Sequence, residues 1–334
     1  MKPASDEQSV SEAVTATALW FEAAGLCQMR QERLPPRAEG EVCVRTLFSG
    51  ISRGTESLVL AGKVPVSEYA RMRGPNMGGD FPFPVKYGYA AVGRIETGPS
   101  DLVNRTVFCL HPHQDFFVVA ADQAVVLPEA LPAGRAILAA NMETALNVVW
   151  DAGILPGDKV AVFGAGVVGS LVAFIASCIV GTDTVLVDRD AGRAHLAASL
   201  GLDFVEASAL QGEFDVLINA SGSSEALERA IRHAGMEARI VEASWYGDRQ
   251  ACIPLGGAFH SRRLQIVSSQ VGAISAIRRP RWSFARRMAK ALELLVDPRL
   301  DVLISGETDF CDLEAAYPSI LSSQDTLCHR IRYR

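Results

Sequence analysis

The stretch that decides the fold is KVAVFGAGVVGSLVAFIASCIVGTDTVLVD, from Lys159 to Asp188. Its first part, Val160–Phe163, is a short apolar run, which is typical of a parallel strand buried on both faces. An apolar segment of helical character follows, from Val167 to about Val180. A second apolar run, Thr184–Val187, closes the stretch. The order of strand, helix and strand predicts one unit of a doubly wound parallel sheet.

Three glycines separate the first strand from the helix in the order G-x-G-x-x-G. Gly164 allows a tight turn, Gly166 lets the backbone approach a pyrophosphate, and Gly169 lets the helix pack closely on the strand. The phosphates would then bind to free N–H groups at the positive end of the helix, at Val167 and Val168. We therefore predict a dinucleotide site, with glycines used for packing alone as the alternative.

Asp188 lies 19 positions after the third glycine (188 − 169). An acid at this offset accepts hydrogen bonds from the adenosine ribose hydroxyls. Its charge repels a 2′-phosphate, so we predict NAD as the cofactor. Arg189 and Arg193 follow closely and keep NADP open as an alternative.

Composition narrows the class of protein. The chain has 334 residues, long enough for two domains, and its net charge of −6 gives no general affinity for nucleic acid. Seven cysteines occur without a C-x-x-C pair, which indicates reduced thiols and a cytoplasmic location. No apolar run reaches membrane-spanning length. We expect a disordered lead-in over residues 1–14, a small-molecule substrate, and no nucleic-acid or membrane partner.

One local cluster of basic residues departs from the negative net charge of the chain. We interpret it as the solvated face of a helix that begins near Trp282, with contact to an anionic substrate as the alternative. Its members are Arg278, Arg279, Arg281, Arg286, Arg287 and Lys290.

The pattern along the chain changes once. Residues 15–126 have the short alternating runs of a β-rich region, interrupted by a Gly- and Pro-rich loop over 71–89. From Pro132 onward, helical segments alternate with strands. We predict a catalytic domain over residues 1–138 and 269–334, and a dinucleotide-binding domain over residues 139–268.

Several motifs together resemble the medium-chain dehydrogenase/reductase superfamily over nearly the whole chain. The resemblance implies a GroES-like (chaperonin-10-like) catalytic domain, a Rossmann domain, and hydride transfer to or from a nicotinamide cofactor in the cleft between them. It also implies a homodimer. The shorter motif SGIS-x-GTE is similar to that of the bacteriochlorophyllide hydroxyethyl dehydrogenase branch, which oxidises a secondary alcohol. The motifs are SGISRGTE (49–56), KYGYAAVGRIETG (86–98), TALNVVWDAGILPGDKVAVFGAGVVG (144–169), FDVLINASGS (214–223) and RRLQIVSS (262–269).

The sequence departs from the zinc-dependent members at their ligand positions. It has Ser52 in place of the ligand cysteine, Gly88-Tyr89-Ala90 in place of Gly-His-Glu, and no four-cysteine lobe. Serine and tyrosine are poor replacements for the Cys, His and carboxylate ligands of catalytic zinc. We predict a zinc-independent enzyme. A rival metal set would use His111, His113 and Glu143.

Without zinc, a hydrogen-bond donor must stabilise the developing oxyanion. Tyr89 can donate to the substrate oxygen, or its ring can pack under the cofactor. Ser52 and Thr55 can form a hydroxyl relay, or they can cap the following helix. Both interpretations remain open for each residue.

Two further groups are candidates for proton transfer. Glu143 can act as a general acid or base if burial raises its pKa, or it can be a carboxylate in the first helical turn. Asn147, one turn further, would share its face. His113 can act as acid or base or form a structural turn, and Lys86 is either an electrostatic helper or solvated.

The remaining cofactor contacts follow from position. The resemblance places Arg53 at a pyrophosphate contact. Asn219, Ala220 and Ser221 follow a strand whose carboxyl end should meet the nicotinamide side of the cleft.

The leading hypothesis is a zinc-independent NAD(P)(H)-dependent oxidoreductase that acts on an alcohol/carbonyl pair or an activated double bond. The alternatives are a dinucleotide-binding protein without turnover, in a structural or sensor role, and a zinc-dependent alcohol dehydrogenase with atypical ligands.

Overall fold

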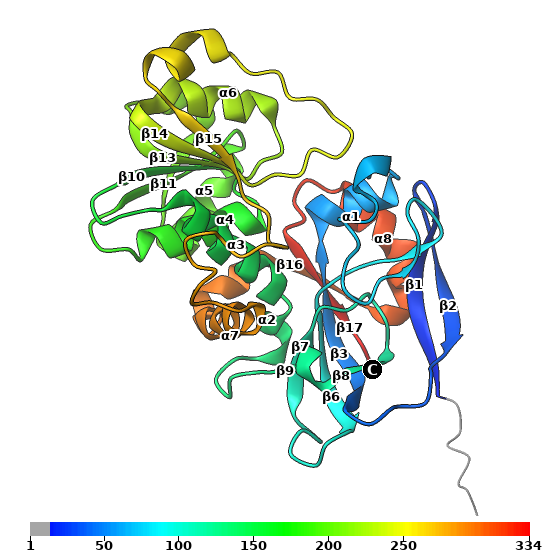
Figure 1. Cartoon of the computed structure of the whole chain (residues 1–334). Coiled ribbons are helices and arrows are strands. Elements are labelled where there is room, and N and C mark those ends of the chain that lie inside the picture. Colours follow the sequence, from blue (N-terminus) through cyan, green and yellow to red (C-terminus); the bar gives the residue numbers. More distant parts are fainter. Residues whose placement is uncertain (1–13) are drawn as a thin grey trace, which may run out of the picture.

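A computed structural model describes residues 14–334, whose strands form three sheets (Figure 1). The predicted disorder of the first residues concerns a segment that, up to residue 13, lies outside the described part. Among the described residues, no helix combines the length and the apolarity needed to cross a membrane.

The upper left of Figure 1 holds a parallel sheet with the strand order β12-β11-β10-β13-β14-β15. Its strands are β10 (Lys159–Phe163), β11 (Asp183–Asp188), β12 (Asp203–Glu206), β13 (Phe214–Asn219), β14 (Ala234–Glu242) and β15 (Gln265–Ser268). The helices around it are α3 (Ala139–Ala152), α4 (Val167–Ser177), α5 (Ala194–Leu200), α6 (Ser224–His233) and α7 (Phe284–Leu294). The predicted parallel sheet with alternating helices is therefore confirmed.

Strand β10 lies inside this sheet, paired with β11 on one side and β13 on the other. Its side chains alternate between two cores. Val160 and Val162 pack into the core that contains residues of α3 and α4. Ala161 and Phe163 pack into the core that contains residues of α6. Burial on both faces explains why the strand has no exposed apolar-polar alternation.

The contact between β10 and α4 requires glycine at two positions. A Cβ atom on Gly169 would lie 1.9 Å from the carbonyl oxygen of Gly164. Gly164 itself has a φ of +104°, and a Cβ there would lie 2.9 Å from the backbone of Ser221. Only glycine permits both the positive φ and the close approach.

The right side of Figure 1 holds two further sheets, ordered β2-β1-β5-β4 and β16-β17-β3-β6-β7-β9. Strand β3 also pairs with β8, and β17 pairs with the end of β3, with Cys328 opposite Ser52. The longer strands are β1 (Thr15–Ala23), β2 (Leu26–Arg33), β3 (Glu41–Ser52), β6 (Ala91–Thr97), β7 (Thr106–Cys109), β8 (Phe116–Ala120), β16 (Ile304–Asp309) and β17 (Cys328–Arg332). The two-residue strands are β4 (Gly78–Gly79), β5 (Val85–Lys86) and β9 (Val125–Val126).

Helices α1 (Arg53–Leu60) and α8 (Leu313–Ser322) pack on these sheets. Both contribute to one core, with Val59 and Leu60 from α1 and Tyr317 from α8. The short helix α2 (Ala133–Ala136) precedes α3. The predicted domain limits stay a prediction.

One part of the basic cluster was predicted wrongly. Arg287 was assigned to a solvated face, but it is only 1% exposed and lies between α7 and α3. Arg279, Arg281 and Arg286 are exposed, as expected. The turn of α7 that carries Arg287 faces the protein interior, because Met288, Ala291 and Leu292 on the same helix are buried.

We expect Gly169→Ala to destabilise the protein by about 1–3 kcal/mol, because the added methyl group must displace the Gly164 carbonyl. Urea unfolding followed by circular dichroism measures this. Gly166→Ala is the matched control, since a Cβ there meets no atom within 4 Å. Equal unfolding free energies for the two variants would contradict the close-packing argument.

Candidate active site

The glycine loop lies at the carboxyl ends of β10, β11 and β13. The Asp188 carboxylate accepts a hydrogen bond from the N–H of Ala165 at 2.6 Å and another from Asp190 at 3.0 Å. The N–H of Ala220 donates to the carbonyl of Phe163 at 2.8 Å. These bonds join the ends of the three strands to one loop, the edge at which open α/β sheets bind ligands.

The start of α4 opens toward this edge. Gly166 is the residue before the helix, with extended backbone, and its side-chain position faces open space. Val167 and Val168 are the first helical residues. The first N–H groups of a helix have no partner inside it and attract anions. The site therefore fits a pyrophosphate group.

Two of the predicted arginines lie close together. Arg53 donates to the carbonyl of Ser323 at 3.1 Å, and Arg193 donates to the carbonyl of Gln324 at 2.6 Å. Burial, and after it the charge of Arg193, lowers the pKa of Arg53. The pair gives this side of the site a positive potential. Arg189 is exposed.

Asn219 lies fully buried at the carboxyl end of β13 and organises a polar cluster. Its Nδ2 donates to Glu242 at 2.7 Å and to the Tyr246 hydroxyl at 3.1 Å, and its Oδ1 accepts from the Ser221 hydroxyl at 2.6 Å. The Glu242 carboxylate also accepts from the N–H of Ser244 at 2.8 Å. Burial raises the pKa of Glu242, and the hydrogen bonds that the carboxylate accepts oppose this rise.

Three residues of this cluster were not predicted from the sequence: Glu242, Ser244 and Tyr246. The signal for Glu242 was present, because it ends β14 as Asn219 ends β13, and both strands were predicted. Ser244 and Tyr246 follow in an irregular segment, where no periodicity indicates which side chains turn toward the strand ends.

The predicted hydroxyl groups lie near one another. The Ser52 and Thr55 hydroxyls oppose the rise in the pKa of Tyr89, and all three residues are partly exposed. Asn141 of α3 donates to the Ser52 hydroxyl at 3.3 Å. Burial, and after it the charge of Glu56, raises the pKa of Tyr89 to about 12. Tyr89 is therefore a protonated hydrogen-bond donor at neutral pH.

Ser52 occupies the N-cap position of α1, but its side chain makes no capping bond. Instead the Glu56 carboxylate accepts the N–H of Ser52 at 2.7 Å. Helix capping, the alternative interpretation of Ser52, is thus wrong for its hydroxyl. Glu56 takes that structural task and leaves the hydroxyl free for Tyr89 and Asn141.

The positions of the family's zinc ligands do not fit zinc. Ser52 and Tyr89 offer only hydroxyls. The resemblance places the third ligand in the region 141–143, where Asn141 donates to Ser52 and the one carboxylate able to coordinate, that of Glu143, is paired with Arg287. Catalytic zinc requires three ligands of the Cys, His or carboxylate type. Within residues 14–334, only Asp309, Cys311 and Asp312 bring three potential metal-ligating atoms together, and Asp309 already pairs with Arg332 and Arg334.

Glu143 lies in the second turn of α3 in a buried ion pair. Its carboxylate accepts a bond from Arg287 Nε at 3.0 Å, and Arg287 also donates to Asn147 at 2.6 Å and to the Val271 carbonyl at 2.6 Å. The interpretation as a first-turn carboxylate is wrong, because no acidic residue lies in that turn. Glu143 and Asn147 share a face, as predicted.

The two histidines lie in different surroundings. His113 is fully buried and contacts Ser49 at 2.8 Å and Glu56 at 3.0 Å. His111 stacks on Phe117 with ring centroids 3.8 Å apart, and burial lowers its pKa to about 3. The structure does not join them with Glu143 as a ligand set. Direct acid/base work by His113 would require access that its burial denies.

Lys86 is not solvated, and it is not part of the group of hydroxyls formed by Tyr89, Ser52 and Thr55. It is buried on β5, where Nζ donates to Glu32 at 2.6 Å and to Gln114 at 2.7 Å. Its charge is therefore already paired within the β-rich region.

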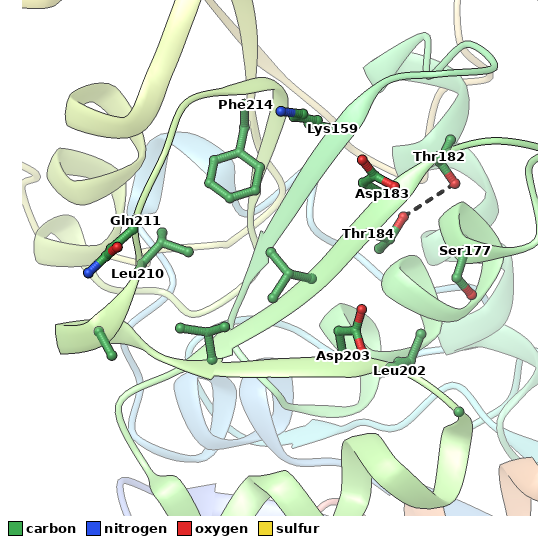
Figure 2. A pocket seen from close by; sticks show the side chains of 14 residues that line it. Lys159, Ser177, Thr182, Asp183, Thr184, Leu202, Asp203, Leu210, Gln211 and Phe214 are labelled. Carbon is green, nitrogen blue, oxygen red and sulfur yellow. Dashed lines mark hydrogen bonds between the residues drawn. The ribbon is translucent and has the colours of Figure 1, made fainter.

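A pocket of about 540 Å³ lies at the opposite edge of the parallel sheet (Figure 2). It is lined by Lys159, Asp183, Asp203 and Phe214, the first residues of four strands. Ligands of such sheets bind at the carboxyl ends of the strands. This pocket is therefore not the dinucleotide site.

Comparisons with known proteins agree with this geometry. No known protein-family profile matches the sequence. The chain is 27% identical over 157 residues to D-xylulose reductase A of Aspergillus niger, a match that covers 41% of this chain and 44% of that protein. It is 27% identical over 188 residues to D-guloside 3-dehydrogenase of Escherichia coli, covering 52% and 53%. The matched segments thus span about half the length of these relatives.

The fold is similar to that of the alcohol dehydrogenase RspB of Escherichia coli, solved with NADH. The TM-score is 0.76 at 18% identity, and the alignment covers 95% of this chain and 99% of that one. The chain has the fold of the medium-chain dehydrogenases/reductases, with a GroES-like part and a Rossmann part. The resemblance predicted from the sequence is confirmed.

We expect Arg287→Met to destabilise the protein by about 3–5 kcal/mol, because it leaves Glu143 buried without its cation. Arg286→Met, which changes an exposed neighbour on the same helix, is the control and should change stability by less than about 0.5 kcal/mol. Urea unfolding compares the two. A small effect of Arg287→Met would show that the ion pair contributes little.

The loss of folding stability in Arg287→Met should depend on pH. Burial raises the pKa of Glu143 and Arg287 opposes that rise, so removing Arg287 raises this pKa further. A carboxyl group with a raised pKa binds more protons in the folded state, and its contribution falls as the pH rises through the folded pKa. The deficit of Arg287→Met should therefore be smaller at about pH 5 than at about pH 8. An equal deficit at both values would exclude titration of Glu143.

Proposed function

We propose that this protein is a zinc-independent NAD(P)(H)-dependent oxidoreductase that transfers hydride on an alcohol/carbonyl pair or an activated double bond. One observation carries the proposal. The glycine loop has the close packing that the dinucleotide motif requires, while the zinc-ligand positions hold the hydroxyls of Ser52 and Tyr89, and the Ser52 hydroxyl accepts a hydrogen bond from Asn141.

The cofactor would be held by the residues at the carboxyl edge of the parallel sheet. Its pyrophosphate would bind at the glycine loop and the start of α4, with Arg53 nearby. Asp188 would meet the adenosine ribose, and its charge favours NAD. Arg193 donates to the Gln324 carbonyl, and its charge keeps NADP open as the alternative. The nicotinamide supplies the hydride chemistry.

Asn219, Ala220 and Ser221 would line the nicotinamide side. The Glu242 carboxylate and the Tyr246 hydroxyl belong to the same cluster and orient the Asn219 side chain, so its Oδ1 points to Ser221. Their contribution is to keep this polar edge ordered when a cofactor arrives.

In carbonyl reduction, Tyr89 would donate a hydrogen bond to the substrate oxygen as negative charge develops there. Such a donor acts by electrostatic stabilisation. A tyrosine phenol is protonated at neutral pH and can donate this hydrogen bond. Ser52 and Thr55 would hold the phenol oxygen and share the proton. Glu143 is bound to Arg287 and is a weaker candidate for acid/base work.

The substrate would be a small molecule that enters between the two halves of the protein. A homodimer would form by pairing of β15, which is an edge strand of its sheet among the described residues.

We expect the protein to quench or shift the fluorescence of NADH on binding, and its turnover to survive exhaustive treatment with a metal chelator. Screening small carbonyl compounds with NADH supplies the assay. Activity that disappears on chelation and returns with added zinc would contradict the zinc-free chemistry. NADH binding without turnover on any substrate would favour the dinucleotide-binding alternative.

Tyr89→Phe should lower kcat for carbonyl reduction roughly a hundredfold or more while NADH affinity stays within about threefold, because one oxyanion donor is lost. Tyr87→Phe is the matched control: Tyr87 is a buried neighbour whose ring lies 6.1 Å from that of Tyr89. Steady-state kinetics and NADH fluorescence titration measure both quantities. Similar kcat values for the two variants would remove Tyr89 from the chemistry.

A further inference from the structure

An arginine without an ion-pair partner lies beside the carboxyl ends of β13 and β14. Arg249 belongs to the segment after β14, which in Figure 1 extends from the parallel sheet toward α1. Its Nε donates to the carbonyl of Tyr246 at 3.2 Å, and its Nη2 donates to the carbonyl of Gly222 at 3.1 Å. The guanidinium carbon lies 5.6 Å from the centre of the Tyr246 ring. These contacts hold the guanidinium in one place, although the residue is exposed.

Both segments that hold Arg249 are themselves fixed to the strand ends. The Tyr246 hydroxyl accepts a hydrogen bond from Asn219 at 3.1 Å and donates to Glu242 at 3.2 Å. The N–H of Gly222 donates to the hydroxyl of Ser244 at 2.9 Å. The guanidinium is therefore oriented before any ligand binds, which reduces the entropy that binding costs.

The charge of Arg249 is not matched by a carboxylate. Other arginines of this half form salt bridges, as Arg232 does with Glu228 on α6. Within residues 14–334 no salt bridge involves Arg249, and its two hydrogen bonds leave Nη1 without a partner in that range. Glu242, the carboxylate that Tyr246 contacts, is not an exception. A guanidinium with a free edge binds the two oxygens of a carboxylate or a phosphate.

The strand order indicates which molecule would supply such an anion. Across the carboxyl edge of the sheet the order is β11-β10-β13-β14. The proposed cofactor has its adenosine ribose at Asp188 on β11, its pyrophosphate at the loop after β10, and its nicotinamide at the end of β13. Arg249 contacts residues that follow β13 and β14, so it lies on the nicotinamide side of the cofactor, where the substrate would bind.

We propose that Arg249 is a specificity-determining residue that binds an anionic group of the substrate, a carboxylate or a phosphate. The substrate would lie between Arg249 and the hydroxyl cluster, which consists of Tyr89, Ser52 and Thr55. The chain has a net charge of −6, which repels anions, so their recognition requires a local cation. This inference rests on the proposed function and names the class of its substrate.

The central experiment compares carbonyl compounds that differ in charge. Levulinate and terephthalaldehydate are offered beside their methyl esters, and formylphenyl phosphate beside anisaldehyde, with NADH as the reductant. The wild-type protein should favour one kind of anion over its neutral counterpart by roughly tenfold or more in kcat/KM, because a charge-assisted hydrogen bond is gained. Arg249→Gln should abolish this preference through a higher KM for the anion, with kcat little changed.

Arg232→Gln is the matched control, since it removes an equal charge from an exposed arginine on α6. It should keep the wild-type preference. Arg249→Lys keeps the charge but loses the planar fork, so it should retain only part of the preference. A purely structural Arg249 predicts a different result, in which kcat/KM falls equally for anions and neutral compounds. That outcome would overturn the proposal.

Titration with NADH separates the substrate from the cofactor as the source of the anion. Arg249→Gln should leave the affinity for NADH unchanged, because the phosphates of the cofactor bind at the glycine loop. A weaker affinity for NADH together with an unchanged anion preference would assign Arg249 to the cofactor and overturn the proposal.

A measurement without turnover keeps this inference distinct from the proposed function. The change in NADH fluorescence when each anion or its neutral counterpart is added to the NADH complex reports binding. If an anion binds more tightly than its counterpart, and Arg249→Gln removes the difference while nothing is reduced, the proposed function fails and the anion site stands. Turnover without any anion preference, or binding of no anion, refutes the role of Arg249.

Discussion

The close approach of α4 to β10 is the constraint on which the cofactor side depends. The helix reaches the strand only because Gly169 has no side chain where the Gly164 carbonyl lies. With the helix at this distance, its N-terminus points to the carboxyl edge of the sheet. The Asp188 carboxylate then reaches the N–H of Ala165, and the residues after Asn219 close against Gly164. One packing contact thus sets the positions of groups from three strands.

Two buried carboxylates show how surroundings decide what an acid can do. The Glu143 carboxylate pairs with the Arg287 guanidinium. Arg287 also donates to Asn147 and to the Val271 carbonyl, which follows β15 in the chain. Such a pair locks α3 against α7, and its proton is not offered to a substrate. Glu56 is fully buried and accepts the N–H of Ser52 and the Tyr317 hydroxyl, so it joins the start of α1 to α8. A buried carboxylate can therefore fix neighbouring elements either through a cation or through several hydrogen-bond donors.

Features with local signals could be predicted from the sequence. The G-x-G-x-x-G loop, the strands on either side and the acid at Asp188 are encoded in consecutive residues, and the structure has each in its expected place. The motif resemblance assigned Ser52 and Tyr89 to two ligand positions of one site, although they are 37 residues apart (89 − 52). The partners of Glu143 and Glu56 could not be predicted. Arg287 lies 144 positions from Glu143, and Tyr317 lies 261 positions from Glu56. Nothing in the local pattern distinguishes Arg287 from its exposed neighbours on α7.

The segment after β14 contacts both sides of the site, the side that contains α1 and the side formed by the strand ends of the parallel sheet, and so fixes their relative position. Trp245 leaves the parallel sheet and packs against the core that contains α1 residues. Gly247, with a φ of +63°, comes so near to the end of α1 that a Cβ would lie 2.9 Å from the Lys63 carbonyl. Tyr246, between them, returns to Asn219 and Glu242. The same few residues therefore touch the helix that begins at the hydroxyl cluster and the strand ends that would face the nicotinamide. Hydride transfer needs donor and acceptor within a few tenths of an ångström of the reactive distance, and a short segment bound to both sides supplies that restraint.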